Sequence, residues 1–397
     1  MKIALLCSGL GNVHRGHEVF ARDLFKLVGD VVDITLFKGG GASAPEEVVV
    51  DNLPRNSACL DHIHVAVSPK WTGAKQEEER NRIEGVTFAY AALKPLLEGG
   101  FDVIHCLERD VCNIIYDQRH LFRNTPKLLF SNGGAIPARY LPRCDFVQEH
   151  TIQNLKYSAK GKSFMIPHGV DLRLFHPEVE SDFRPQHGIP TEAFVVISVG
   201  VISYGHKRMD YVIREVAAVP DAYLIMVGQE NKDTAEIKEL GRQLMGERVV
   251  FTKLPHDELP KAYAAANVFT LGSVFETFGI VYVEAMAMGL PVICTNHVNQ
   301  RDIVKDGVFI DVKKPGALTA ALQPGERAAL QAMGHRAHKI AANHYDLEAL
   351  KRKYVEQYQA IAAAKTTLPT YSLVDKLIFN ARSSVRKAAT LVYGRAE

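Results

Sequence analysis

Short apolar segments alternate with longer stretches whose apolar residues recur at helical spacing, from the first residues to about residue 311. This alternation is typical of parallel sheets whose strands are joined by helical crossovers. In the first half, strands are predicted at 2–7, 31–37, 61–67, 102–105, 127–131, 145–148 and 163–166. Helices are predicted at 16–28, 76–97 and 151–157. The first half is therefore expected to form a doubly wound α/β domain.

The segment 166–190 interrupts this alternation, because it combines Pro, Gly and mixed charges without an apolar period. After it, strands are predicted at 194–199, 223–227, 249–252, 268–271, 292–295 and 308–311. Two such α/β domains in tandem would face each other across a central cleft, where the carboxyl ends of their strands bind ligands. We therefore predict a domain at 1–170, a linker at 171–190 and a second domain at 191–344.

Beyond residue 317 the pattern is helical, with helices predicted at 325–343 and 346–364 and Asp346 as an N-cap. We expect the segment 345–365 to return to the first domain. A basic amphipathic tail is then predicted at 371–394, within a region (351–397) that carries nine Lys or Arg against three acids. Such a tail either lies on an anionic membrane or packs on the chain's own first domain.

Composition excludes several classes of protein. The chain of 397 residues has 47 Lys and Arg against 45 Asp and Glu, so a net charge of +2 gives no global field to attract nucleic acid. The apolar run at the N-terminus is too short for a signal peptide, and no apolar run approaches eighteen residues, so we expect a cytoplasmic protein that contacts the inner membrane face only through the tail. Six scattered cysteines without a CxxC pair predict reduced thiols and no structural zinc site.

The most informative segment is SVFETFGIVYVEAMAMGLPVICT, residues 273–295. Glu276 lies in the turn after a predicted strand, Gly279 opens a helix, and Glu284 lies inside that helix. The helix is apolar all round and is therefore expected to be buried, so the Glu284 carboxylate needs partners rather than solvent. For Glu276 the alternatives of a loop carboxylate and a helix cap stay open. The first N–H groups of this helix have no internal partner and can bind an anion or a hydroxyl.

A second group of residues follows the strand that ends at Gly200. A short loop brings His206, Lys207 and Arg208 to the start of the next helix. Cations at a helix N-terminus oppose the helix dipole, so their position suggests that an anion binds among them. The alternative is that Lys207 is an ordinary exposed lysine.

The glycine loop after the first strand contains Gly9, Gly11 and Gly16. Their spacing is not that of a dinucleotide-binding fingerprint, and the second strand ends without the acidic residue that would hold a ribose, so a nicotinamide enzyme is disfavoured. The glycines still allow a ligand to approach the backbone closely, and His14 and Arg15 lie on the same loop.

Taken together, these motifs resemble glycosyltransferase family 4, whose members are retaining enzymes with two facing Rossmann-like domains, the GT-B fold. The E-x7-E segment and the linker carry most of this resemblance. It extends to the glycine loop and to the segments 101–105, 200–207 and 224–228.

The resemblance implies roles for individual residues. Glu284 would bind the ribose of a UDP- or GDP-linked sugar, Glu276 would contact the donor sugar, and Lys207 would neutralise the diphosphate. The expected catalytic residues are Glu276, Lys207 and His105. The expected donor-binding residues are Glu284, Phe278, Gly279, Ile280, Arg208, Gly9, Gly11 and Arg15. No metal site is expected, because a lysine and a helix N-terminus can stabilise the leaving diphosphate. The resemblance also implies that the acceptor attacks from the same face as the departing phosphate, so no protein nucleophile is expected.

Two positions depart from the family. An arginine usual after the glycine that matches Gly200 is replaced by Val201, and a histidine usual in the loop after the fifth strand is replaced by Asn132. Either Arg15, His206 or Arg208 substitutes for the missing arginine, or donor handling and activity are altered. His168 in the linker is expected to be a hydrogen-bonding loop residue, whereas His105 at a strand end is expected to face the cleft.

The sequence thus predicts a metal-independent retaining glycosyltransferase that moves a sugar to an acceptor hydroxyl on a glycan or a lipid-linked molecule. The acceptor would lie mainly on the first domain and the donor on the second. A nucleotide-sugar epimerase of the same architecture and a non-catalytic nucleotide-sugar-binding subunit remain the alternatives. The sequence does not identify the base, the sugar, the acceptor or the linkage.

Overall fold

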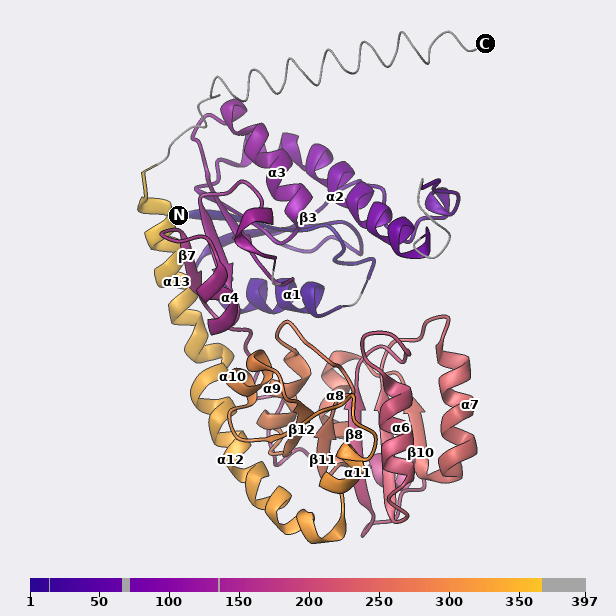
Figure 1. The fold of residues 1–397 in the computed structure, drawn as a ribbon. Coiled ribbons are helices and arrows are strands. Elements are labelled where there is room, and N and C mark those ends of the chain that lie inside the picture. The colour runs from indigo at the N-terminus through magenta and orange to yellow at the C-terminus, as the bar shows by residue number, and fades with distance from the viewer. Residues whose placement is uncertain (14, 66–71, 135, 366–397) are drawn as a thin grey trace, which may run out of the picture.

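The computed structural model describes residues 1–13, 15–65, 72–134 and 136–365. It consists of two α/β domains, one above the other in Figure 1, with the last two helices running along one side of both. The predicted fold class of two facing Rossmann-like domains followed by C-terminal helices is confirmed. His14, the end of the strand predicted at 61–67 and the tail predicted at 371–394 lie outside the described residues, so the predictions on them stay predictions.

The N-terminal domain is built on a seven-stranded parallel sheet. In spatial order its strands are β3 (Glu47–Val49), β2 (Asp33–Lys38), β1 (Lys2–Cys7), β4 (Val103–Cys106), β5 (Lys127–Ser131), β6 (Phe146–Glu149) and β7 (Ser163–Met165). Its helices are α1 (Gly16–Val28), α2 (Thr72–Gly99), α3 (Arg109–Asp117) and α4 (Ile152–Tyr157).

Side chains of β1 alternate between the two faces of this sheet, as the period of two in a strand requires. Ile3 and Leu5 pack with α1, whereas Ala4 and Leu6 pack with α2 and α3. The central strand is buried on both faces and therefore has an uninterrupted apolar sequence.

The edge of this sheet differs from the prediction. The segment EVV forms β3 and pairs with β2, with Leu36 opposite Glu47, whereas residues 61–65 form a turn and coil instead of the predicted strand. That prediction was wrong over 61–65, because these residues alternate between apolar and polar side chains but are exposed or half-buried, and so have no core face to pack against.

The C-terminal domain is built on a six-stranded parallel sheet. In spatial order its strands are β10 (Val249–Thr252), β9 (Ala222–Val227), β8 (Phe194–Val199), β11 (Val268–Thr270), β12 (Val292–Thr295) and β13 (Val308–Ile310). Its helices are α5 (Phe183–Gln186), α6 (Met209–Ala217), α7 (Thr234–Met245), α8 (Leu259–Ala264), α9 (Ile280–Ala287), α10 (Val298–Val304), α11 (Ala317–Ala321) and α12 (Arg327–Tyr345).

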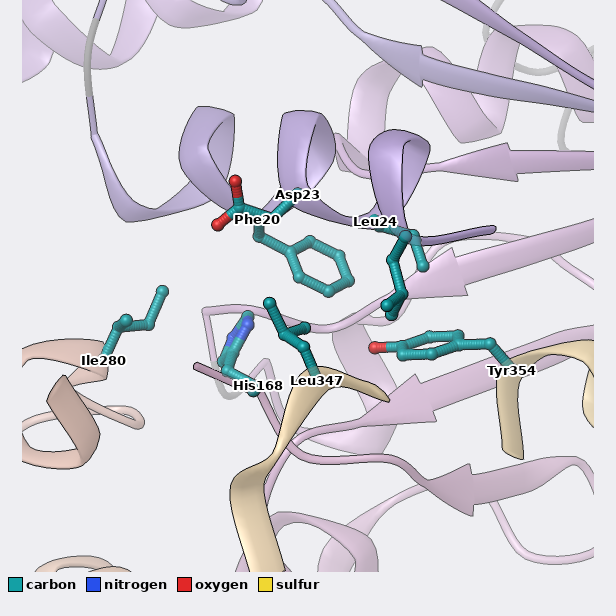
Figure 2. Close-up of a pocket in the computed structure, with 9 residues that line it drawn as sticks. Phe20, Asp23, Leu24, His168, Ile280, Leu347 and Tyr354 are labelled. Atoms are coloured by element: carbon teal, nitrogen blue, oxygen red, sulfur yellow. The ribbon is translucent and has the colours of Figure 1, made fainter. Parts of the chain in front are cut away.

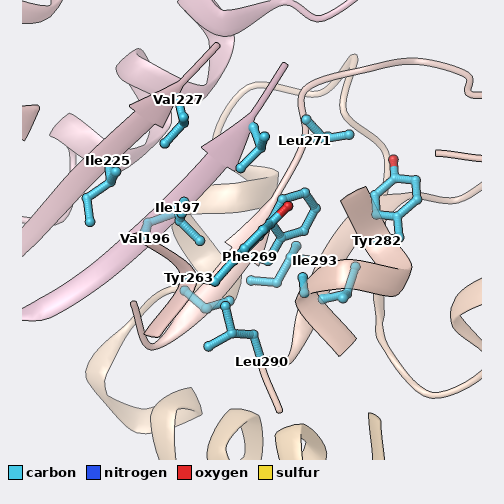
Figure 3. Close-up of a cluster of buried hydrophobic side chains, with 14 of the residues drawn as sticks. Val196, Ile197, Ile225, Val227, Tyr263, Phe269, Leu271, Tyr282, Leu290 and Ile293 are labelled. Atoms are coloured by element: carbon cyan, nitrogen blue, oxygen red, sulfur yellow. The ribbon is translucent and has the colours of Figure 1, made fainter. Parts of the chain in front are cut away.

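Aromatic side chains fill the centre of the C-terminal core (Figure 3). The Phe269 ring on β11 packs edge-on against Tyr282 of α9, with centroids 5.8 Å apart, and also contacts Tyr263 of α8. This packing holds the buried α9 helix, which carries the second glutamate of the E-x7-E motif, firmly on the sheet.

Two segments pass side by side between the domains. The linker residue Val170 donates its N–H to the carbonyl of Tyr345, and Leu347 donates back to Val170. At this crossing α12 ends and α13 (Leu347–Ala363) begins, and the side chain of the predicted N-cap Asp346 accepts from the N–H of Glu348. Buried Tyr354 and Tyr358 of α13 then pack on the N-terminal domain.

In the described part of the chain, none of the helices is both long enough and apolar enough to cross a membrane.

Candidate functional site

Each sheet has one topological switch point, the pair of adjacent strands from which the strand order runs in opposite directions. In the C-terminal sheet it lies between β8 and β11, and in the N-terminal sheet between β1 and β4. Ligands of open α/β sheets bind outside the carboxyl ends of such strand pairs. We use the name C-terminal switch point for the residues that follow β8 and β11, namely Lys207 and Glu276. The N-terminal switch point is the corresponding place after β1 and β4, with Ser8 and Glu108.

At the C-terminal switch point Lys207 and Glu276 form an ion pair, with Lys207 Nζ 2.5 Å from Glu276 Oε1. The aliphatic part of Lys207 lies over Gly200, where a Cβ would come within 3.3 Å of it. Gly200 at the end of β8 therefore leaves the space through which the lysine reaches the glutamate.

The charge of Glu276 is fixed by its neighbours. The carboxylate is only 7% exposed, and His206 Nε2 lies 3.2 Å from the same oxygen that Lys207 contacts. Burial raises the pKa of Glu276, but its contacts with His206 and Lys207 outweigh burial and lower the pKa to about 2. Glu276 is therefore ionised throughout the neutral range.

Helix α9 begins directly beside this ion pair. Its N-cap is Gly279, which has a left-handed backbone (φ 82°), and a Cβ there would lie 2.6 Å from the Tyr282 ring. No side chain from the described part of the protein caps the helix. The first amides of α9, beginning with that of Ile280, are thus available to an anion or a hydroxyl.

The loop before α9 is held in place from behind by two buried amide side chains of α10. Gln300 donates to the carbonyl of Glu276 at 3.0 Å, and Asn299 donates to the carbonyl of Thr277 at 3.2 Å. Neither residue was singled out in the sequence. Two adjacent amide side chains at the start of a helix, shortly after β12, are the sequence feature that could have identified them.

Glu284, the second glutamate of the motif, is buried and has protein partners. His256 Nε2 lies 2.9 Å from one carboxylate oxygen, and the Tyr263 hydroxyl donates to the other at 2.9 Å. Burial lowers the pKa of His256, but Glu284 and the more distant Asp23 raise it more, so the pKa is raised overall. Asp23 belongs to α1, so this charge pair lies at the boundary of the two domains.

The starts of α1 and α9 meet across that boundary. A Cβ on Gly16 would lie 3.6 Å from Ile280 Cδ1. A small pocket beside this contact is lined by α1, α9, α13 and the segment 168–169, with Asp23, His168, Ile280 and Tyr354 among its residues (Figure 2). The two domains are therefore in contact at the starts of α1 and α9.

His168 has a different setting from the one predicted. Its ring stacks on His150, with centroids 3.9 Å apart, and lies edge-on to Phe20 and Phe278. Its Nδ1 atom is buried and has no hydrogen-bond partner within the described residues. The prediction of a hydrogen-bonding loop residue was therefore wrong, because aromatic packing holds this ring.

His105 does not face the cleft, so that expectation was wrong. It is fully buried, with Nδ1 2.8 Å from the Tyr358 hydroxyl and Nε2 2.7 Å from Ser131 Oγ. Burial lowers its pKa to about 3. Both ring nitrogens serve the contact between β4, β5 and α13, which leaves neither for a substrate.

Other predicted donor-binding residues lie apart from the ion pair or are occupied. Arg208 donates to the carbonyl of Val312 at 2.7 Å and covers the Tyr211 ring, so its guanidinium is engaged away from Glu276. Gly11 (φ 92°) is pressed against the backbone of Gly40, and Gly9 lies against Glu18, so protein rather than ligand fills the space beside both glycines. Arg15 is exposed beside the contact between α1 and α9.

Asn132, one of the two departures from the family, has a structural role. Its amide donates to the buried Glu149 carboxylate at 3.0 Å and to the carbonyl of Ile136, and its oxygen accepts from the Ile136 N–H. Val201, the other departure, is 38% exposed.

The N-terminal switch point carries a charged network that the sequence did not reveal. Glu108 accepts from the N–H and the hydroxyl of Ser8, and Ser8 also donates to the buried Glu84, which pairs with Arg55. Cys7, His17 and Glu108 could hold a metal ion, because their ligand atoms all lie within 4.8 Å of one another. These residues come from β1, α1 and the end of β4, and their separation in sequence hides the cluster.

Comparison with known proteins supports the resemblance seen in the motifs. Residues 179–326 match the family model described as "Glycosyl transferases group 1". D-inositol 3-phosphate glycosyltransferase 1 of Catenulispora acidiphila is 33% identical over 154 residues, which cover 35% of this chain and 37% of that protein. The chain spans about half or less of the length of the curated relatives it matches.

Solved structures show the same fold over nearly the whole chain. Sucrose-phosphate synthase of Thermosynechococcus elongatus has a TM-score of 0.74 at 20% identity, covering 92% of this chain and 100% of that one. The HepE protein of Anabaena in complex with UDP-glucose has a TM-score of 0.69 at 17% identity, with 91% and 100% covered. Together these findings confirm the resemblance to glycosyltransferases with the GT-B fold, and the matched segment contains Lys207, Glu276 and Glu284.

Proposed function

We propose that this protein is a retaining glycosyltransferase of family 4 that moves a sugar from a nucleoside-diphosphate sugar to an acceptor hydroxyl. The observation that carries the proposal is the Lys207–Glu276 ion pair beside the uncapped start of α9, at the switch point of the domain that matches the glycosyltransferase model. The neighbour bound to UDP-glucose supports a nucleotide-sugar as the donor.

The leaving diphosphate develops negative charge as the bond to the sugar breaks. Lys207, His206 and the first amides of α9 converge on one place where such charge is stabilised. No metal is needed for this step, since a lysine and a helix N-terminus provide the positive potential. Arg15, the exposed N-cap residue of α1, would add a cation from the other domain.

Glu276 has a second role in the proposal. Its carboxylate accepts from Lys207 and is ionised, so it can also accept hydrogen bonds from hydroxyls of the donor sugar. Glu284 is already held by His256 and Tyr263, and each of its oxygens keeps a lone pair for a ribose hydroxyl. The acceptor, a glycan or a lipid-linked molecule, would enter from the N-terminal domain.

The test is a panel of nucleotide-sugars incubated with the full chain, with and without a cell extract as the source of acceptor. A transferase releases nucleoside diphosphate only when acceptor is present and transfers the sugar label to it. An epimerase changes the nucleotide-sugar without acceptor, and a binding subunit shifts the melting temperature with one nucleotide but turns nothing over. Either of the last two results would overturn the proposal.

A further inference from the structure

Three side chains with metal-ligating atoms converge at the N-terminal switch point. Cys7 ends β1, His17 lies in the first turn of α1, and Glu108 follows β4. Their ligand atoms all lie within 4.8 Å of one another. The donor site described above lies on the other domain and uses none of them.

Two of these atoms are buried and make no hydrogen bond in the described part of the chain, namely His17 Nε2 and Glu108 Oε2, although His17 Nε2 lies at ion-pair distance from the other oxygen of Glu108. The Cys7 thiol beside them is fully buried. A buried carboxylate oxygen and a buried imidazole nitrogen are costly when they make no hydrogen bond, so such atoms in a native structure need an explanation, and a bound ion is one. A cation satisfies both at once.

The distances suit a tetrahedral ion. Ligands about 2.0 to 2.3 Å from zinc lie about 3.5 Å from one another. His17 Nε2 and Glu108 Oε1 are 3.4 Å apart, so two of the three ligands already have this spacing. Small side-chain rotations bring the third, Cys7 Sγ, into range from within 4.8 Å.

The surroundings also favour a cation. Ser8 donates to Glu108 through its N–H at 2.8 Å and its hydroxyl at 3.1 Å, which orients the carboxylate as outer hydrogen bonds do at metal sites. A second carboxylate, Glu18, follows His17 in α1, and the nearby Arg55 is paired with Glu84. The side chains of His17 and Glu108 are 30% and 17% exposed, so an ion can reach them from solvent.

We propose that Cys7, His17 and Glu108 form a binding site for a divalent zinc-class ion, with a fourth position open to water. A thiolate, an imidazole and a carboxylate together select Zn²⁺ or Co²⁺ over Mg²⁺ and Ca²⁺, which prefer oxygen ligands alone. The site is independent of the proposed transferase function, since it lies on the domain opposite the donor. It places a metal at the carboxyl ends of β1 and β4, on the domain where the acceptor would bind.

The test begins with the full chain purified in the presence of a chelator and then freed of it. Titration with Co²⁺ should produce one equivalent of a thiolate-to-cobalt charge-transfer absorption in the near ultraviolet, which Zn²⁺ removes by competition. Calorimetry with Zn²⁺ should give one site per chain. Mg²⁺ should neither produce the signal nor compete with it.

Three variants locate the site. Cys7→Ser should abolish the charge-transfer band, and His17→Gln, at a position whose side chain is 30% exposed, should weaken Zn²⁺ binding by about 100-fold or more. Ser8→Ala, which removes a support of Glu108, should weaken it by about 10-fold. Cys59→Ser removes the exposed thiol and is the matched control that should bind Zn²⁺ normally.

The proposal is overturned if the intact chain shows no charge-transfer band, or if the band survives in His17→Gln and disappears in Cys59→Ser. Loss of the band in a misfolded Cys7→Ser protein would not decide the matter, so circular dichroism accompanies each variant and His17→Gln carries the conclusion. Nucleoside diphosphate affinity, measured in the same samples, should not change with Zn²⁺, which separates this test from that of the transferase.

Discussion

The two switch points share a topology but differ in charge. In the C-terminal domain the carboxylate of Glu276 is matched by Lys207 and His206. In the N-terminal domain Glu108 accepts hydrogen bonds from the N–H and the hydroxyl of Ser8 and lies 3.4 Å from His17 Nε2, while Arg55 is already paired with Glu84. The carboxylate that follows the second strand of the pair is thus matched by a lysine and a histidine in one domain, but by a histidine and neutral donors in the other.

This difference shows which part of the site depends on the fold and which on individual residues. A doubly wound sheet brings the ends of two strands and the start of a helix to one place, whatever the ligand. The side chains that follow the strands decide whether an anion or a cation binds there. Substitutions that change the charge at either switch point therefore test the comparison directly.

The largest effect is expected from removing the carboxylate charge at the C-terminal switch point. Glu276→Gln keeps the volume but cannot hold Lys207 or the donor hydroxyls as a carboxylate does, so turnover should fall by about 100-fold or more. Nucleoside diphosphate affinity should change much less, because Lys207 remains. Steady-state rates and nucleotide affinity are the measurements, with the exposed Glu247→Gln as control. Full turnover in Glu276→Gln would remove the carboxylate from the mechanism.

The same ion pair should make stability depend on pH. The folded-state pKa of Glu276 is about 2, below its ordinary value of 4.5, so its stabilisation is present above pH 4.5 and is lost as the pH falls toward 2. The size of this stabilisation is about 3 kcal/mol. Denaturant unfolding of the wild type and Glu276→Gln at several pH values should show a stability gap that narrows below pH 4.5. A gap that stays constant down to pH 3 would contradict the low pKa.

A smaller effect is expected from the cation of the same pair. Lys207→Ala removes one charge-assisted contact with the diphosphate and should weaken nucleoside diphosphate binding by about 1.5 to 3 kcal/mol. Calorimetric titration checks this, with Lys238→Ala as the matched control, because Lys238 is a half-buried lysine of α7 that is also ion-paired with a glutamate, Glu230. If Lys207→Ala binds like the wild type, the diphosphate lies elsewhere.

In the N-terminal domain, replacing Asn132 with the histidine that is usual in the family should destabilise the protein. Asn132→His loses amide contacts with the buried Glu149 and with Ile136, so the free energy of unfolding should fall by about 1 to 3 kcal/mol. Denaturant unfolding measures this change. An increase in turnover at unchanged stability would show that the loop after β5 reaches the substrate.

Periodicity in the sequence predicted most of the fold because apolar strands and amphipathic helices follow local rules. It failed at the sheet edge, where residues 47–49 form the strand beside β2 and residues 61–65 form a turn and coil. Lys207 and Glu276 could be predicted because each directly follows a strand of the switch point. The partners of Glu284 and the cluster of Cys7, His17 and Glu108 could not be predicted from the sequence. These residues are far apart in the sequence and come into contact only when distant strands and helices pack together.

The smallest effect is expected from adding a positive charge at the C-terminal switch point, which would increase the difference between the two domains. Val201 follows Gly200 and is 38% exposed, so an arginine there can extend toward solvent without displacing core residues. Val201→Arg should tighten nucleoside diphosphate binding by up to about 1 kcal/mol, because an exposed charge is screened by water, and the gain should shrink with added salt. Val201→Gln, which has similar reach without charge, is the matched control. If both variants bind nucleoside diphosphate with the same affinity, then Lys207, His206 and the start of α9 already neutralise the diphosphate. An arginine at position 201 would then add nothing to binding.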